Sequence, residues 1–368
     1  MKIQFNDLKN LFLNYKKVKE KIFKVVDEKN YILGKSVIDL EKKLASFTGS
    51  KYCATTSSGT DALLIALLSL NLKKNSEVIT PGFSYIASAE VIVRAGLKPI
   101  FVDVELDTAI VDVSEIEKKI NKNTSCIIVV SLFGQIPNIE KLKKIKKKYK
   151  IPIIEDGAQS FGSSYRNLKS GNIFDIGCTS FFPTKSLGCF GDGGAIFTNK
   201  KNLFSRFKQI RQHGQKKKYY FDIPGLNARL DTIQAVVLIE KLKKLKKNIY
   251  HKKLLFQKYE KYLLDEKNIK FTKIKKNYYS CYPLFNIIVP NRNNLAIFLR
   301  KKKIPTNIYY PLPLSEQKVF CINKKKMIIL PNSKKLSKSI LSLPFHLSLK
   351  ENQIRFITDN IKKFYKRK

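Results

Sequence analysis

The strongest constraint on the fold is a regular alternation of apolar segments and helical patterns between residues 51 and 199. Seven short segments are predicted to be strands: 51–58, 77–82, 98–104, 125–131, 151–156, 176–182 and 193–199. Most are apolar along their whole length, as expected for strands buried on both faces. Helical patterns such as 61–72 and 138–150 separate them. We therefore predict an α/β fold whose mostly parallel sheet is covered by helices on both sides.

The chain changes character after a long helical pattern at about 231–262. The segments that follow are shorter, and a proline-rich turn occurs at 309–314. We expect a large domain over 1–245, N-terminal helices included, and a smaller α+β domain over 246–368, with the long helix bridging them. The first 23 residues predict an amphipathic helix rather than a secretion signal. No apolar segment is long enough to suggest a membrane span.

The composition is strongly basic, with 71 Lys and Arg against 29 Asp and Glu and a formal net charge of +42. Such a charge often indicates binding to nucleic acid or to an anionic membrane. However, only nine of the basic residues are arginine, and the lysines are spread over most predicted helices. We therefore expect a generally basic surface, with no specific nucleic-acid partner and no membrane association.

The six cysteines have no CxxC spacing, which favours buried free thiols over disulfides or a metal site. Buried free thiols in turn favour a cytoplasmic location.

One lysine is isolated in a chain where lysine is the commonest residue. Between Asn172 and Asn199 the only lysine is Lys185, which lies in the stretch TSFFPTKSLGCFGDGG, five residues after Ser180. A lysine in apolar, glycine-rich surroundings is a candidate for a lowered pKa and for use as an amine nucleophile. The alternative is an ordinary loop lysine whose amine reaches solvent.

Two other predicted strand ends carry residues suited to a ligand, because ligands bind beyond the carboxyl ends of parallel strands. In SSGTDAL, Gly59 and Thr60 begin a predicted helix and would suit a phosphate; helix capping by Ser58 or Thr60 is the simpler alternative. In IIEDGAQSFG, Asp156 and Gln159 follow an apolar strand. The Asp156 carboxylate could hold a cationic ring nitrogen, or it could cap the next turn.

Pyridoxal phosphate would account for these groups together. It requires a lysine for a Schiff base, an acid for its ring nitrogen and a site for its phosphate. The segment PGFSYIAS adds Phe83 or Tyr85 as an aromatic residue to stack on the ring.

Five segments in their order carry a family resemblance: SSGTDAL, PGFSYIAS, IIEDGAQSFG, TSFFPTKSLGCFGDGG and GLNARLDTIQA. Together they resemble the DegT-type sugar-nucleotide aminotransferases, a branch of the fold-type I enzymes that depend on pyridoxal 5'-phosphate. The resemblance covers nearly the whole chain. VSLFGQ and RQHGQ are most similar to the subgroup that acts on a UDP-linked 3-keto hexuronic acid in lipopolysaccharide (O-antigen-type) biosynthesis. It implies L-glutamate as the amino donor, a UDP-sugar as the acceptor and no metal.

The resemblance also implies a role for each matching residue. Lys185 matches the lysine that holds pyridoxal phosphate as a Schiff base, and Asp156 matches the acid that pairs with the ring nitrogen. The other cofactor-binding matches are Gly59, Thr60 and Ser180 at the phosphate, Tyr85 stacked on the ring, Gln159 near the ring hydroxyl and Asn227 reaching the phosphate from a second subunit. The substrate-binding matches are Arg229, His213 and Tyr309. Asn227 thus implies a homodimer with a shared active site.

Two positions depart from the subgroup, since Tyr309 and Ser315 stand where it usually has histidines. Both positions face the substrate, so a 4-aminotransferase acting on a 4-keto-6-deoxy sugar nucleotide remains an alternative. A sugar 3-dehydratase of the same family has histidine in place of Lys185, which argues against that activity. A basic nucleic-acid-binding protein is the alternative from a different class, but it gives no reason for an isolated lysine and a strand-end acid.

Overall fold

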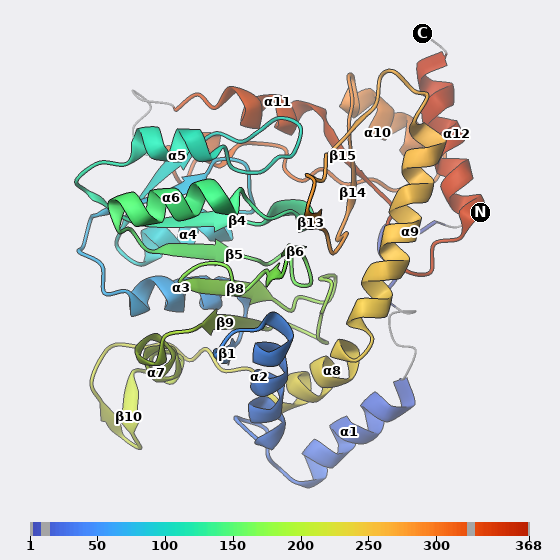
Figure 1. The fold of residues 1–368 in the computed structure, drawn as a ribbon. Helices are drawn as coiled ribbons and strands as arrows, with labels where there is room; N and C mark the ends of the chain where they lie inside the picture. The colour runs from blue at the N-terminus through green and yellow to red at the C-terminus, as the bar shows by residue number, and fades with distance from the viewer. Residues whose placement is uncertain (1–2, 9–14, 322–327, 367–368) are drawn as a thin grey trace.

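The centre of the molecule is a seven-stranded sheet in the order β1-β9-β8-β5-β4-β2-β3 (Figure 1). The computed structural model describes residues 3–8, 15–321 and 328–366. The strands of the sheet are β1 (Tyr52–Thr56), β2 (Glu77–Pro81), β3 (Lys98–Val102), β4 (Thr124–Val130), β5 (Ile153–Asp156), β8 (Ile176–Ser180) and β9 (Gly194–Thr198). The pairings of β3, β2, β4, β5 and β8 are parallel, whereas β9 is antiparallel to both β8 and β1. The predicted mostly parallel sheet is confirmed.

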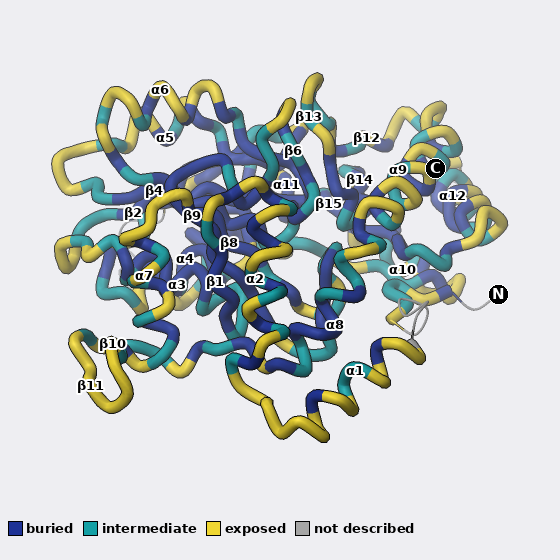
Figure 2. Tube along the Cα trace, turned by 60° about the horizontal axis from the view of Figure 1, so that its bottom comes forward, coloured by how far each residue is buried: buried dark blue, intermediate teal, exposed yellow. Residues whose placement is uncertain are grey.

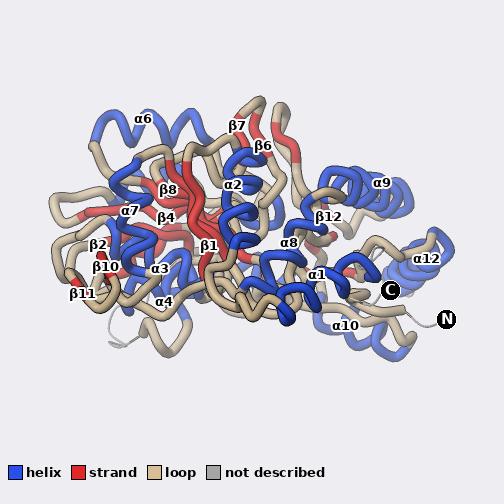
Figure 3. Tube along the Cα trace, turned by 90° about the horizontal axis from the view of Figure 1, so that it is seen from below, coloured by secondary structure: helices blue, strands red, loops and turns tan. Residues whose placement is uncertain are grey.

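Helices cover both faces of this sheet (Figure 3). Successive residues of a strand point to opposite faces. Val78 and Ile128 therefore pack with α3 (Gly59–Ser69), α4 (Ala87–Arg94) and α7 (Lys201–Ile210). Ile79 and Val129 pack on the other face, with α5 (Val113–Lys119) and α6 (Ile139–Tyr149). The same face near β1 and β9 is covered by α2 (Lys35–Thr48). In Figure 2 the strands of the sheet are mostly buried.

The predicted N-terminal helix begins later than expected. Residues 3–8 are not helical, 9–14 lie outside the described residues, and α1 spans Tyr15–Asp27. Val18 and Val25 are its buried residues, two helical turns apart on one face.

The prediction of a single long helix over 231–262 is wrong, because the structure has two helices there. α8 spans Thr232–Leu242 and α9 spans Leu245–Leu263, with Lys243 and Lys244 forming the break. α8 packs against α1 and α2, whereas α9 packs against α12 (Glu351–Lys366). The two apolar faces have different partners, so one straight helix could not bury both.

The C-terminal part contains a second sheet, of order β12-β14-β15. Its elements are β12 (Lys270–Phe271), β14 (Phe285–Ile288), β15 (Ile340–Leu343), α10 (Arg292–Lys301) and α11 (Pro331–Ser339). Two small sheets complete the fold: β13 (Tyr278–Tyr279) pairs with β6 (Ser164–Tyr165), which pairs with β7 (Leu168–Lys169), and β10 (Gln215–Lys217) pairs with β11 (Tyr220–Phe221). Short 3-10 turns lie at Leu132–Gly134 and Leu314–Glu316.

The six cysteines are all free, and five of them are buried, with Cys321 half-buried. Among the described residues, no helix has the length and apolar character needed to cross a membrane.

Candidate active site

The carboxyl ends of β5 and β8 place the main candidate residues at one edge of the sheet. Asp156 ends β5, Ser180 ends β8, and Lys185 lies in the tight loop that leads to β9. The Lys185 backbone N–H donates to the Phe182 carbonyl at 2.9 Å. A Cβ at Gly188 would lie 2.5 Å from the Pro183 carbonyl oxygen. Glycine is needed there because the backbone folds so closely on itself, which keeps Lys185 on a constrained loop.

Lys185 and Asp156 interact electrostatically. Burial lowers the pKa of the half-buried Lys185 amine, while the charge of Asp156 opposes this effect. Burial raises the pKa of Asp156, and a hydrogen bond from the Ala158 N–H at 3.1 Å opposes that rise. Among the described residues this is the one hydrogen bond that the Asp156 carboxyl accepts. Asp156 therefore caps the next turn, as the simpler alternative predicted, and still has an oxygen free to face a ligand.

Gln159 joins three distant parts of the chain. Its Oε1 accepts from the Phe133 N–H at 3.0 Å, and its Nε2 donates to the Tyr310 hydroxyl at 3.0 Å. The Tyr310 ring lies 6.2 Å from the ring of Tyr85, centroid to centroid, and 5.8 Å from that of Tyr309. Burial also raises the pKa of Tyr310. Sequence reasoning did not identify Tyr310, although it stands next to Tyr309, so the signal was present in the YYP turn.

The start of α3 lies against the end of β8. A Cβ at Gly59 would lie 2.7 Å from Ser180 Cβ, so glycine permits this approach. Ser58 is the N-cap, and its Oγ accepts from the Asp61 N–H at 3.0 Å. The simple capping interaction is therefore present. Gly59 and Thr60 still stand in the first turn, where backbone N–H groups lack helical partners and favour an anion.

Three other candidate residues form a separate group in this chain. Arg229 Nη2 donates to Asn227 Oδ1 at 2.7 Å, and the exposed His213 donates its backbone N–H to Leu226 at 2.9 Å. Within the described residues, no hydrogen bond or ion pair joins them to Lys185 or Asp156. Their segment nevertheless lies beside the start of α3, because the Ser57 N–H donates to the Ala228 carbonyl at 3.1 Å.

A buried network behind Asp156 was also missed from the sequence. Glu155 accepts hydrogen bonds from the Ser131 and Ser170 hydroxyls at 2.7 Å each and from the Gly171 N–H at 2.8 Å. The Ser131 N–H also donates to the Asp156 carbonyl at 2.9 Å. The network therefore anchors the strand end that carries Asp156. Its members are far apart in sequence, so the only signal was the strand-end position of Glu155.

Residues 14–362 match the DegT/DnrJ/EryC1/StrS aminotransferase family. The chain belongs to this family. It is 40% identical over 356 residues to UDP-2-acetamido-2-deoxy-3-oxo-D-glucuronate aminotransferase of Pseudomonas aeruginosa, covering 96% of this chain and 98% of the relative. A DegT/DnrJ/EryC1/StrS aminotransferase structure from Brucella abortus superposes with a TM-score of 0.93 at 34% identity, covering 98% and 99% of the two chains. NtdA of Bacillus subtilis, solved with bound cofactor PMP, gives 0.91 at 28% identity, covering 98% and 85%.

The protein is thus a sugar aminotransferase that depends on pyridoxal phosphate. The residues present fit this cofactor. The Asp156 carboxyl is buried with an oxygen available, Lys185 has a lowered pKa, and the Gly59–Ser180 approach leaves a helix N-terminus beside them.

Proposed function

We propose that this aminotransferase transfers the amino group of L-glutamate to a UDP-linked 3-keto-2-acetamido hexuronic acid, giving the 3-amino sugar. The observation that carries the proposal is the 40% identity, over 96% of the chain, to the P. aeruginosa enzyme whose substrate is a UDP-2-acetamido-2-deoxy-3-oxo-D-glucuronate. A relative from Acidithiobacillus ferrooxidans, a UDP-N-acetyl-3-dehydro-α-D-glucosamine 3-aminotransferase, is 32% identical over 93% of the chain and points to the same ring position. We place the reaction in the cytoplasm, in the synthesis of O-antigen-type polysaccharide.

Two groups of residues would hold the cofactor. Gly59, Thr60 and Ser180 would bind its phosphate at the start of α3, where the helix dipole favours a dianion. Asp156 would bind the ring nitrogen through its available oxygen. Gln159 would lie by the ring hydroxyl, held in place by Phe133 and Tyr310. Tyr85, a residue that is 58% exposed in this chain, would cover one face of the cofactor ring.

Lys185 would carry the proton during transfer. Pyridoxal phosphate, when bound, supplies an aldehyde that takes up the amino group and a ring that holds the electrons of the deprotonated carbon. A lysine can act as a base only in its neutral form, and burial favours that form at Lys185. Asp156 would keep a proton on the ring nitrogen, because a buried carboxyl that accepts one hydrogen bond has an oxygen available for a charge-assisted hydrogen bond from the ring N–H.

The sugar nucleotide would be held by Arg229, His213 and Tyr309, with Arg229 as the main anion-binding residue. Its guanidinium can bind a carboxylate or a phosphate through two parallel hydrogen bonds, and its buried Nε has no hydrogen-bond partner among the described residues. We propose that this segment serves the site of a second subunit, with Asn227 at the phosphate, in a homodimer. Its lack of hydrogen bonds or ion pairs to Lys185 and Asp156 within one chain supports this arrangement.

The test is a comparison of acceptors with glutamate as donor. We expect the 3-keto uronic acid to be used best, and Arg229→Lys to lose about tenfold or more of kcat/KM on it, because a lysine cannot bind a carboxylate bidentately. Lys247→Met, an exposed change on α9, is the control. If a 4-keto-6-deoxy sugar nucleotide is the better substrate of the wild-type enzyme, the 4-aminotransferase alternative replaces this proposal. A protein with no activity on any keto sugar nucleotide would contradict both.

A further inference from the structure

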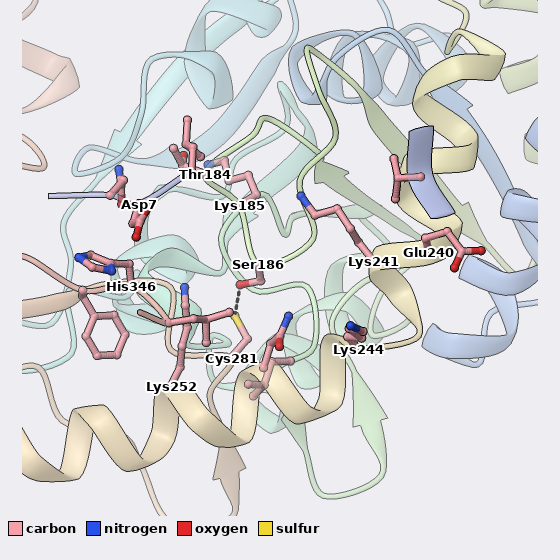
Figure 4. A pocket seen from close by; sticks show the side chains of 17 residues that line it. Asp7, Thr184, Lys185, Ser186, Glu240, Lys241, Lys244, Lys252, Cys281 and His346 are labelled. Atoms are coloured by element: carbon pink, nitrogen blue, oxygen red, sulfur yellow. Dashed lines mark hydrogen bonds between the residues drawn. The ribbon is translucent and has the colours of Figure 1, made fainter. Parts of the chain in front are cut away.

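A pocket lined by an excess of lysines opens beside Lys185 (Figure 4). Lys241 and Lys244 reach it from the end of α8 and the break after it, and Lys252 reaches it from α9. Asp156, Gln159, Tyr85 and Tyr310 are not part of its lining. The pocket therefore lies on a different side of Lys185 from the candidate residues for the cofactor ring.

Lys252 lines this pocket and forms no ion pair with any residue that the structure describes. Its Nζ lies 5.7 Å from the centroid of the Phe345 ring and has no hydrogen bond or ion pair with any described residue. Burial lowers its pKa, with the Cys281 thiol opposing. Figure 4 shows its side chain leaving α9 toward the pocket. A half-buried amine with only an aromatic ring beside it gains most from an anion.

Two acids, Glu240 and Asp7, also line the pocket. Glu240 forms ion pairs with Lys21 and Lys243, neither of which lines the pocket. Asp7 accepts a hydrogen bond from the Ser348 hydroxyl. The pocket lining therefore holds four lysines and two carboxylates, and the Glu240 carboxylate is paired with lysines outside the lining.

Neutral polar groups also line the pocket. His346 is 92% buried, and its Nδ1 shares a hydrogen bond with the Ser348 hydroxyl at 2.9 Å. Its Nε2 has no partner that satisfies hydrogen-bond geometry among the described residues. Asn248 lies four residues before Lys252 on α9, so both side chains project from the same face of that helix. A cation and an amide on one face of a helix, both lining one small pocket, form a set suited to a carboxylate.

We propose that this pocket binds a substrate carboxylate, with Lys252 as its principal ligand and Asn248 beside it. The inference rests on the proposed function for the source of that carboxylate. One source is the side chain of a dicarboxylic amino donor, and the other is the acid group of the keto sugar. The pocket would then select substrates by charge at a point next to Lys185.

Binding to the holoenzyme, measured by titration calorimetry, tests the proposal without turnover. The probes are glutarate, which resembles the donor, and D-glucuronate, which resembles the sugar acid. We expect Lys252→Met to weaken one of them by about tenfold or more, Lys252→Arg to restore most of the binding, and added salt to weaken it. Lys247→Met, the same change on an exposed face of α9, should bind as the wild type does.

The outcomes separate the two sources. Selective loss of glutarate binding assigns the pocket to the donor, and selective loss of glucuronate binding assigns it to the sugar acid. If Lys252→Met binds both probes as the wild type does, the proposal is overturned. Should that variant fold poorly by thermal unfolding, Asn248→Ala provides the same comparison. The two proposals can also fail separately. If Lys252→Met loses glutarate binding but the wild-type enzyme does not use a keto uronic acid, the proposed sugar substrate is contradicted and the pocket still binds a carboxylate.

Discussion

At the scale of single residues, the surroundings of each lysine decide whether the pKa of its amine is lowered. Lys185, Lys241 and Lys252 all line one pocket, and burial lowers the pKa of each. Of these three lysines, only Lys185 has a carboxyl group, that of Asp156, whose charge opposes the lowering of its pKa. Sequence isolation pointed to Lys185 alone, because Lys241 and Lys252 lie within lysine-rich helices where nothing local marks them.

Borohydride treatment of the holoenzyme, followed by peptide mapping, should find the pyridoxyl group on Lys185. The physical reason is that Lys185 combines a lowered pKa with a neighbouring acid at the strand end. Lys185→Ala should give no labelled peptide. A label on Lys241 or Lys252 would transfer the proposed role to that residue.

At the scale of elements, the break between α8 and α9 has an electrostatic consequence. Lys241 lies in the last turn of α8, just before the chain turns away to pack elsewhere. Burial there lowers its pKa from 10.5 to about 8, while Cys189 opposes the shift. A continuous helix, as predicted from the sequence, would not have required the change of direction at Lys243 and Lys244.

Lys241 should make the free energy of unfolding rise with pH between about 8 and 10.5. In this window the unfolded chain holds a proton on Lys241 that the folded chain has lost, so raising the pH favours folding, by at most ~3 kcal/mol. Below about pH 8 both states are protonated and the slope from this group disappears. Lys241→Met should remove that part of the slope in urea unfolding at pH 8 and pH 10, and Lys247→Met should not. Equal slopes in wild type and Lys241→Met would disprove the assignment.

At the scale of the whole molecule, the division into two domains and the assembly into a homodimer are proposals. We propose a large domain over 1–245 and a small one over 246–368, with α9 as the first helix of the second. The pairing of β13 with β6 joins the two parts, so they do not pack as independent bodies. We also propose the homodimer, because Asn227 and Arg229 hydrogen-bond to each other rather than to the Lys185 group.

Mixing two inactive variants tests the shared site. If Lys185 of one subunit works with Asn227 of the other, Lys185→Ala and Asn227→Ala should each be nearly inactive. Random exchange of their subunits should restore about a quarter of wild-type activity, because half the dimers are mixed and each mixed dimer has one intact site. Sedimentation should show dimers throughout. Dimers that recover no activity would place the whole site within one chain, and a monomer would contradict the proposal outright.

Local patterns in the sequence determined the order of strands and helices along the chain, the sheet covered on both faces, the position of Asp156 at a strand end and that of Lys185 in the loop after another strand. These follow from apolar periodicity and turn chemistry, which act over a few residues. Only the tertiary structure decided that Gln159 hydrogen-bonds to Tyr310 and that Glu155 accepts hydrogen bonds from Ser131 and Ser170. It also decided that Lys252 lines a pocket without an ion-pair partner among the described residues. Gln159 and Tyr310 are 151 residues apart, and no local preference encodes such a contact. The helix break at 243–244 was likewise decided by packing, because α8 and α9 bury their apolar faces against different partners.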